Sequence, residues 1–416
     1  MSRTVHVIGG GLAGLSAATV LAERGVRVIL SEAAAQAGGR CRSYVDPQLD
    51  MMIDNGNHLV LSGNRAVMTY LKRLGTQDRL AGPDSADLAF MDLRDGTRWR
   101  LRPNDGPLAW WVFAPNRRVP GTGPADYLPL AALLARHPGM RIDQVLKPRG
   151  VLWERLLEPF FLAALNTEAV AGSADLAGAI VRETLAKGGQ ACRPRIAHPT
   201  LAAAFVEPAL DYLKAKGAQV RLGRRLKSIE AEGDTVRTLE FGDGAVVLGP
   251  DDRAILAVPP NHAQALLPGL DAPNEFRSIV NGHFALPAAE RPADAPLITG
   301  LVGGAAEWLF VFEDRVSVTV SGADAIVDDN RDDLAARLWA DVARVLQLGD
   351  RPLPPWQIVK ERRATFAATP EQDAKRPGAR TALTNLVLAG DWTQTGLPAT
   401  IEGALRSGET AARLVI

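Results

Sequence analysis

This chain of 416 residues has few cysteines, few histidines and no net charge. It has two cysteines and six histidines, and its 47 basic residues balance its 47 acidic ones. Cys41 and Cys192 lack the spacing of a metal or redox motif, so we expect no metal site and a reducing compartment. A net charge of zero leaves no electrostatic footprint for nucleic acid, and we expect no such partner.

Long apolar runs and repeats are absent as well. No stretch reaches the length of a membrane span, and the first apolar run is too short for a signal peptide. We therefore expect a cytoplasmic protein. With 416 residues and no repeat, the chain is long for one hydrophobic core and predicts two intertwined domains, while its oligomeric state stays open.

The most informative motif lies at the start of the chain, where an apolar run leads into a glycine-rich turn. Residues 5–8 read as a buried strand, 15–24 as a helix and 26–30 as a second strand. This layout predicts a dinucleotide-binding βαβ unit, whose glycines allow a tight turn, approach of a pyrophosphate and close helix packing. An acidic residue after the second strand accepts hydrogen bonds from ribose hydroxyls. The predicted contacts are Gly9, Gly11, Leu12, Ala13, Gly14 and Glu32.

Two further segments indicate that the dinucleotide is FAD. A second glycine pair followed by arginine extends the fingerprint just past Glu32, which a nicotinamide enzyme does not need, and arginine there can donate to phosphate and ribityl oxygens. Residues 386–401 read as a strand, a turn with a carboxylate and the start of a helix, whose positive N-terminus suits the flavin edge that becomes anionic on reduction. The predicted contacts are Gly38, Gly39, Arg40, Gly390, Asp391, Thr400 and Ile401.

The chain resembles the flavin amine oxidase and phytoene desaturase superfamily in two stretches, VIGGGLAGLSAA near its start and LAGDWTQTGLPATIEGALRSGE near its end. Within it, stretches at 53–58, 158–167 and 308–313 resemble the squalene-associated FAD-dependent enzymes, the hydroxysqualene dehydroxylases. Asn57 departs from the glutamine more usual there. The resemblance implies an α/β fold with a Rossmann-like FAD-binding domain of the glycine-doublet flavoprotein type and an inserted α+β substrate domain.

Together with the strand pattern, the resemblance implies that the FAD-binding domain is discontinuous. Segments 1–65, 200–265 and 380–416 are expected to form it. Segments 66–199 and 266–379 are expected to form the substrate-binding domain. Further flavin contacts implied by the resemblance are Gly56, Asn57 and the backbone near Leu226.

The resemblance also implies an activity, the reductive dehydroxylation of hydroxysqualene to squalene in hopanoid and squalene biosynthesis, on a hydrophobic C30 isoprenoid. Asp54 and His58 are the titratable side chains expected at the flavin face, and they are our candidates for the catalytic acid or an orienting group. The alternative is that Asp54 only pins a turn and His58 is a core histidine.

Other functions differ in specific features. A carotenoid-type phytoene or squalene desaturase uses the same cofactor with hydride flowing the opposite way, and sequence alone does not fix that direction. A flavin amine oxidase is disfavoured because Thr400 and Ile401 stand where that class has an aromatic ring, and the chain has only four tyrosines. The intact FAD motifs argue against a non-enzymatic prenyl carrier.

Apolar segments at 108–113, 128–134 and 160–165 line a tunnel for an isoprenoid, form a patch that docks on a membrane, or belong to an ordinary core. Trp110 and Trp111 lie close to Arg117 and Arg118 in the sequence, a combination typical of a lipid surface. Peripheral contact with the inner face of the cytoplasmic membrane therefore stays open beside a core position for these two rings.

Overall fold

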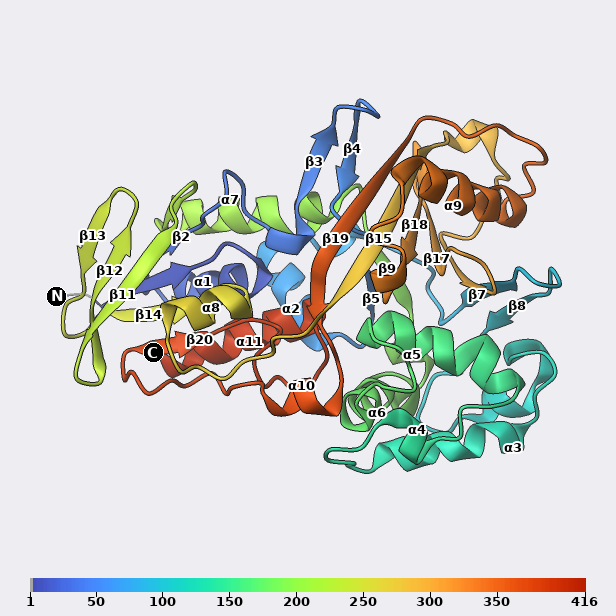
Figure 1. The fold of residues 1–416 in the computed structure, drawn as a ribbon, viewed down its shortest axis with the longest axis horizontal. Helices are drawn as coiled ribbons and strands as arrows, with labels where there is room; N and C mark the ends of the chain where they lie inside the picture. Colours follow the sequence, from blue (N-terminus) through green and yellow to red (C-terminus); the bar gives the residue numbers. More distant parts are fainter. Residues whose placement is uncertain (1–2) are drawn as a thin grey trace.

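The structure is a computed structural model that describes residues 3–416, so the first two residues of the predicted segment 1–65 lie outside it. Figure 1 shows an elongated molecule. A parallel sheet and both chain ends lie toward one end, and a larger mixed sheet with its helices lies toward the other. The predicted α/β class is confirmed.

A parallel sheet of five strands forms the first layer, in the order β10-β2-β1-β14-β20. Its central strands are apolar and buried because helices cover one face, while the antiparallel strands of residues 226–247 pack on the other. Helix α1 (Leu12–Glu23) packs so closely on α11 (Ile401–Leu414) that a Cβ on Gly408 would lie 2.2 Å from the oxygen of Ala13. The strands are β1 (Thr4–Ile8), β2 (Arg27–Ser31), β10 (Gln219–Arg221), β14 (Arg253–Leu256) and β20 (Leu386–Leu388).

A mixed sheet of seven strands forms the second layer, in the order β19-β15-β18-β17-β16-β7-β8, with β16 parallel to β7 and the other pairs antiparallel. Alternate residues of a strand face opposite sides, and Val316 and Val318 pack with the residues of helix α9 (Arg331–Val345). The strands are β7 (Leu88–Asp92), β8 (Arg98–Leu101), β15 (Phe276–Ala285), β16 (Ile298–Val302), β17 (Trp308–Val311), β18 (Arg315–Val320) and β19 (Trp356–Phe366).

In the described part of the chain, smaller strand elements and eight further α-helices accompany the two sheets. The remaining strands form three small groups. They are a hairpin of β3 (Ser43–Asp46) and β4 (Met51–Asp54), a small sheet of β5 (Leu59–Leu61), β6 (Leu80–Ala81) and β9 (Pro194–Ala197), and an antiparallel sheet of β11 (Leu226–Glu232), β12 (Thr235–Phe241) and β13 (Gly244–Val247). The remaining α-helices are α2 (Arg65–Leu74), α3 (Pro124–Tyr127), α4 (Ile142–Val145), α5 (Glu158–Leu165), α6 (Ala174–Glu183), α7 (Glu207–Ala215), α8 (Pro260–Leu266) and α10 (Pro370–Ala374). Within residues 3–416, no helix has the length and apolarity needed to cross a membrane.

The two adjacent tryptophans of the helical region have different environments. Trp111 belongs to the core, because its ring packs edge-on against Tyr127 at 5.1 Å and is 5% exposed. Trp110 is 51% exposed. Only the first of the two rings therefore suits a surface role.

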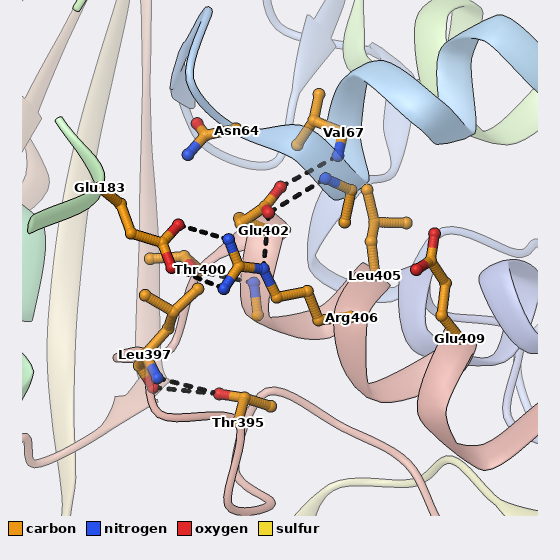
Figure 2. A network of polar contacts seen from close by, with 12 residues as sticks. Asn64, Val67, Glu183, Thr395, Leu397, Thr400, Glu402, Leu405, Arg406 and Glu409 are labelled. Atoms are coloured by element: carbon orange, nitrogen blue, oxygen red, sulfur yellow. Dashed lines mark hydrogen bonds and ion pairs between the residues drawn. The ribbon is translucent and has the colours of Figure 1, made fainter. Parts of the chain in front are cut away.

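A buried carboxylate ties three helices together (Figure 2). Glu402, in the first turn of α11, accepts hydrogen bonds from the backbone N–H groups of Ala66 and Val67, both at 3.0 Å. These groups open helix α2, which has no side-chain cap of its own. Arg406 donates to Glu402 at 2.7 Å and pairs with Glu183, the last residue of α6. The N-terminus of α11 is thereby fixed relative to α2 and α6.

Replacing Glu402 with glutamine should lower the free energy of unfolding by about 3 kcal/mol, since it leaves Arg406 half-paired in a buried site. The matched control is Glu409→Gln, because Glu409 pairs with Arg413 at the same i,i+4 spacing of the same helix but Arg413 is largely exposed. Glu409→Gln should lower the free energy of unfolding by less than about 0.5 kcal/mol. Guanidinium unfolding of both variants measures the difference, and equal losses would contradict the role of Glu402.

Candidate functional site

Each glycine of the first loop has its own steric reason. Gly9 has a φ of +109°, and a Cβ there would lie 2.2 Å from the oxygen of Ala257. A Cβ on Gly14 would lie 1.9 Å from the oxygen of Gly9, which explains the close packing of helix on strand. By contrast, a Cβ on Gly11 would meet nothing within 4 Å, so the backbone there faces open space. This is the arrangement that a pyrophosphate needs.

The start of α1 leaves its backbone donors free of side-chain capping. Gly11 is the N-cap and supplies no side chain, and Leu12 and Ala13 form the first turn with buried side chains. Their N–H groups lie at the positive end of the helix, where an anion is stabilised.

Glu32 is oriented by its own backbone surroundings. One carboxylate oxygen accepts the N–H of Gly10 at 2.6 Å and the other accepts that of Ala34 at 2.7 Å. The carbonyl of Glu32 accepts the N–H of Arg224 at 2.7 Å, which brings the start of β11 at Leu226 toward the same end of the sheet. The negative charge is therefore fixed at the end of β2.

The second glycine loop packs directly on the first. Gly38 donates its N–H to the oxygen of Gly10 at 2.8 Å and forms a parallel bridge with Gly11. Both Gly38 and Gly39 have positive φ values, +109° and +56°, which favour glycine. The loop then delivers Arg40 to the middle of the molecule.

Arg40 links the two ends of the chain. Its Nη2 donates to Oδ2 of the buried Asp391 at 2.7 Å, and its Nη1 donates to the oxygen of Ala364 at 2.6 Å. The Asp391 carboxylate raises the pKa of Arg40. The Arg40 side chain is nevertheless 43% exposed, so the pair presents unused donors on its open side.

Arg376 supports the turn that carries Asp391, and no sequence motif marks this arginine. Its buried guanidinium donates to the carbonyl oxygens of Asp391 and Thr393 at 3.1 and 2.5 Å. Gly390 has a φ of +151°, and a Cβ there would lie 2.4 Å from Nε1 of Trp392. The turn is thus stabilised by hydrogen bonds from the Arg376 guanidinium and by close packing of the Trp392 indole on Gly390.

Helix α11 begins directly after this turn. Thr400 is its N-cap and accepts the N–H of Gly403 at 3.0 Å, and Ile401 is the first helical residue. Together with the Glu402 network, this cap fixes the direction of the helix N-terminus.

Asp54 has clear structural contacts. Its Oδ1 accepts the hydroxyl of Ser43 at 2.5 Å and the N–H of Leu201 at 2.9 Å. Burial raises the pKa of Asp54. One oxygen therefore joins the β3–β4 hairpin to the helix that follows β9, and the carboxyl group is closer to protonation than an exposed aspartate.

Asn57 points toward the mixed sheet. Its Nδ2 donates to Oγ1 of Thr319 at 3.1 Å, and Thr319 donates to Oδ1 of Asn281 at 2.8 Å. A Cβ on Gly56 would lie 3.1 Å from Nδ2 of Asn281. Oδ1 of Asn57 is buried without a hydrogen-bond partner among residues 3–416, as is Nε2 of His283 two residues beyond Asn281. A polar residue in a buried strand was the only available signal for Asn281.

His58 lies beside Arg40. Burial and the positive charge of Arg40 lower the pKa of His58 to about 4. The imidazole is therefore neutral at physiological pH and can donate or accept a hydrogen bond without carrying a charge.

These positions form a continuous arrangement that fits an extended dinucleotide. Glu32 and the start of β11 lie at one end, the two glycine loops lie in the middle, and the Arg40–Asp391 pair with His58 lies at the other. The open space beside Gly11 and the half-exposed Arg40 fit a phosphate-bearing ligand. Among residues 3–416, no cluster of three or more His, Cys, Asp or Glu side chains suits a metal ion.

Cys41 lies inside the second glycine loop, but its surroundings suppress thiol chemistry. Cys41 and Cys192 are both buried, and burial raises the pKa of each to about 12. A thiol-specific disulfide reagent at pH 8 should therefore label neither cysteine in the folded protein and both in guanidinium. Any flavin should be released by denaturation. Rapid labelling of one native thiol would contradict this expectation.

Comparisons with known proteins agree with this geometry. The family profile described as "Flavin containing amine oxidoreductase" matches residues 12–416. A hydroxysqualene dehydroxylase of Rhodopseudomonas palustris is 52% identical over 417 residues, covering 100% of this chain and 99% of that protein. A 15-cis-phytoene desaturase of Glycine max is 23% identical and covers 99% of this chain and 79% of its own. Among solved structures, an oxidoreductase from Methanosarcina mazei is similar in fold, with a TM-score of 0.74, 14% identity and coverage of 99% and 100% of the two chains.

Proposed function

We propose that this chain, which belongs to the flavin containing amine oxidoreductase family and within it to the hydroxysqualene dehydroxylases, reduces hydroxysqualene to squalene. The observation that carries the proposal is the likeness to a dehydroxylase over the full length of both chains. The 23% likeness to a phytoene desaturase supports the same superfamily but a more distant relation.

FAD is the flavin that we propose. Glu32 accepts hydrogen bonds from the ribose hydroxyls and leaves no room for a 2′-phosphate. The two glycine loops hold the pyrophosphate, and Asp391 holds a ribityl hydroxyl beside Arg40. The N-terminus of α11 faces the flavin edge that becomes anionic. The proposed contacts are Gly9, Gly11, Leu12, Ala13, Gly14, Glu32, Gly38, Gly39, Arg40, Gly56, Asn57, Leu226, Gly390, Asp391, Thr400 and Ile401.

When bound and reduced, the flavin supplies the hydride that replaces the hydroxyl group of the substrate. The protein must supply a proton to the departing oxygen, hold the alcohol in place and exclude water. We propose that Asp54 holds the proton, because burial raises its pKa. His58 stays neutral and orients the hydroxyl group as a hydrogen-bond partner.

The proposal extends to the organisation of the molecule. Segments 1–65, 200–265 and 380–416, which supply all five strands of the parallel sheet, hold the cofactor, and 66–199 and 266–379 hold the C30 isoprenoid. The protein acts in the cytoplasm and contacts the membrane peripherally, since its substrate partitions into lipid.

An anaerobic assay tests the reaction and its direction. Enzyme loaded with reduced FAD should convert hydroxysqualene to squalene, detected by mass spectrometry of the extracted lipid. A colourless purified protein would instead fit a prenyl carrier. If oxidised enzyme dehydrogenates phytoene while hydroxysqualene is untouched, a desaturase replaces the dehydroxylase.

Asp391→Ala should weaken FAD binding roughly ten- to hundredfold, since it removes a charge-assisted hydrogen bond of about 1.5–3 kcal/mol. Asp391→Asn is the matched control because it keeps an acceptor for Arg40 and loses only the charge. The loss of FAD affinity in Asp391→Asn should be smaller than in Asp391→Ala. Titration of the apoprotein with FAD measures both constants, and an unchanged affinity in the alanine variant would falsify the assigned role.

Asp54→Asn should slow turnover at least about hundredfold while FAD affinity stays near that of the wild type, because general acids contribute about 10²–10⁴-fold. Asparagine keeps Oδ1 as an acceptor for Ser43 and Leu201, so the local structure is preserved. His58→Gln keeps a hydrogen-bond donor, so its turnover rate should fall less than that of His58→Ala.

The pH dependence separates the two groups. A pKa of about 4 leaves His58 neutral above pH 5, so its titration should not appear between pH 5.5 and 8. The wild-type rate should fall as the pH rises through the raised pKa of Asp54, and Asp54→Asn should remove that dependence. A rate that falls around pH 6.5 and loses this fall in His58→Gln would make the histidine the acid.

A further inference from the structure

Large apolar side chains are concentrated on the surface of the helical region formed by residues 108–151. Six of the twelve exposed large apolar side chains of residues 3–416 lie within these 44 residues. Single exposed apolar residues are normal, but a concentration of this kind marks a binding surface. We call this group the apolar patch; it consists of Leu108 (79% exposed), Trp110 (51%), Phe113 (70%), Leu128 (72%), Leu134 (47%) and Val151 (40%).

A rigid frame holds the apolar patch outward. The buried Asn104 donates Nδ2 to the oxygen of Leu108 at 2.9 Å and accepts the N–H of Trp111 at 3.1 Å. The rings of Trp111 and Tyr127 contact one another edge-on beneath the surface. Because Trp110 precedes one of these rings and Leu128 follows the other, the turns that carry the exposed side chains are fixed side by side.

The segment that carries the apolar patch has a positive net charge. Residues 108–151 contain six basic and two acidic residues, a net charge of +4 in a chain whose total is zero. Asp143 pairs with Arg141 at 3.0 Å and Asp126 accepts the N–H of Gly123 at 2.7 Å. Arg136 pairs with Asp175, outside the segment, at 3.4 Å. The guanidinium of Arg117 lies over the ring of Trp110 at 4.7 Å. An exposed aromatic ring under a cation suits a lipid headgroup region.

The position of the apolar patch suits uptake of a hydrocarbon. In Figure 1, α3 and α4 lie at the opposite end of the molecule from both chain ends. Beneath them, one hydrophobic cluster runs from Trp111 and Leu133 through Phe161 to Trp308 of the mixed sheet. The interior behind the patch is therefore continuously apolar.

We propose that the apolar patch docks this protein on the surface of an anionic lipid bilayer. Uptake of the isoprenoid substrate through the same surface rests on the proposed function. A second copy of this chain fits less well, because an isologous dimer would bring two +4 surfaces face to face.

Vesicle flotation with FAD-loaded protein tests the docking. The variant Leu108→Ser/Phe113→Ser/Leu128→Ser should bind vesicles of phosphatidylcholine and phosphatidylglycerol at least about tenfold more weakly than the wild type. The matched control Val45→Ser/Val247→Ser/Leu353→Ser removes three exposed apolar side chains elsewhere and should bind normally. Unchanged flavin absorption shows that each variant is folded.

Charge and depth supply independent readouts. Arg117→Glu/Arg149→Glu should lower binding to the anionic vesicles more than tenfold, because both residues belong to the basic segment, and high salt should weaken wild-type binding. Brominated lipids should quench part of the tryptophan fluorescence on binding, and Trp110→Phe should remove that quenching while binding persists.

Each outcome decides the proposal. Equal binding of the wild type and the patch variant, or no binding of the wild type, overturns it. A patch variant that changes only the oligomeric state also overturns it, in favour of a protein interface. Turnover of detergent-dispersed hydroxysqualene should be equal in the wild type and the patch variant, while turnover of vesicle-embedded substrate should fall in the variant. Vesicle binding by a protein inactive on both forms would refute the proposed function and leave the docking intact.

Discussion

The ion pair between Arg40 and Asp391 is the contact on which the dinucleotide site depends. It joins a loop near the start of the chain to a turn near its end, and the same guanidinium reaches Ala364 at the end of the longest strand of the mixed sheet. One side chain therefore holds both sheets and both FAD fingerprint segments. Because the two partners are 351 residues apart, the site is assembled from both end regions of the chain.

Two titratable groups near this pair are driven in opposite directions by their surroundings. Burial raises the pKa of Asp54 despite its hydroxyl and amide donors, whereas desolvation and the nearby guanidinium lower the pKa of the half-buried His58. A carboxyl group shifted toward protonation and an imidazole kept neutral form a pair suited to acid chemistry at an alcohol. Burial is the main cause of the lowered pKa of His58, and the positive charge of Arg40 adds to it, so the arginine that is proposed to contact the cofactor also favours the neutral imidazole.

The sequence predicted those parts of the site whose chemistry is local. The positive φ values of Gly9 and Gly38 and the contact of Gly14 with Gly9 are local, and the strand, helix and turn pattern around them is read from hydrophobic periodicity. The contact of Gly9 with Ala257 is not local and could not be predicted in this way. Arg376 and Glu402 could not be predicted, because their partners come from other chain segments and no spacing marks them.

Local irregularities were equally hidden from the sequence. Short π-helical turns precede Pro159 and Pro208, where proline lacks the N–H that a regular helix would use. The environments of Trp110 and Trp111 also could not be told apart, since adjacent rings differ only in what the rest of the fold places against them.

The side of the mixed sheet that faces away from α9 has a polar part and an aromatic part. This division matches an alcohol with a long hydrocarbon chain. Ser317 and Thr319 of β18 lie beside Asn281 and His283 of β15, next to the segment that carries Asp54 and His58. The neighbouring strand β17 instead contributes the aromatic side chains Trp308 and Phe310 to the cluster that extends to the helical region. Polar groups left without partners are costly in a buried setting. Among residues 3–416, Oδ1 of Asn57 and Nε2 of His283 have no partner on the polar part, and Nε1 of Trp308 has none on the aromatic part. An oxygen-bearing carbon is thereby best accommodated near the proposed flavin site, and the hydrocarbon remainder along the aromatic strand that leads toward the exposed apolar surface.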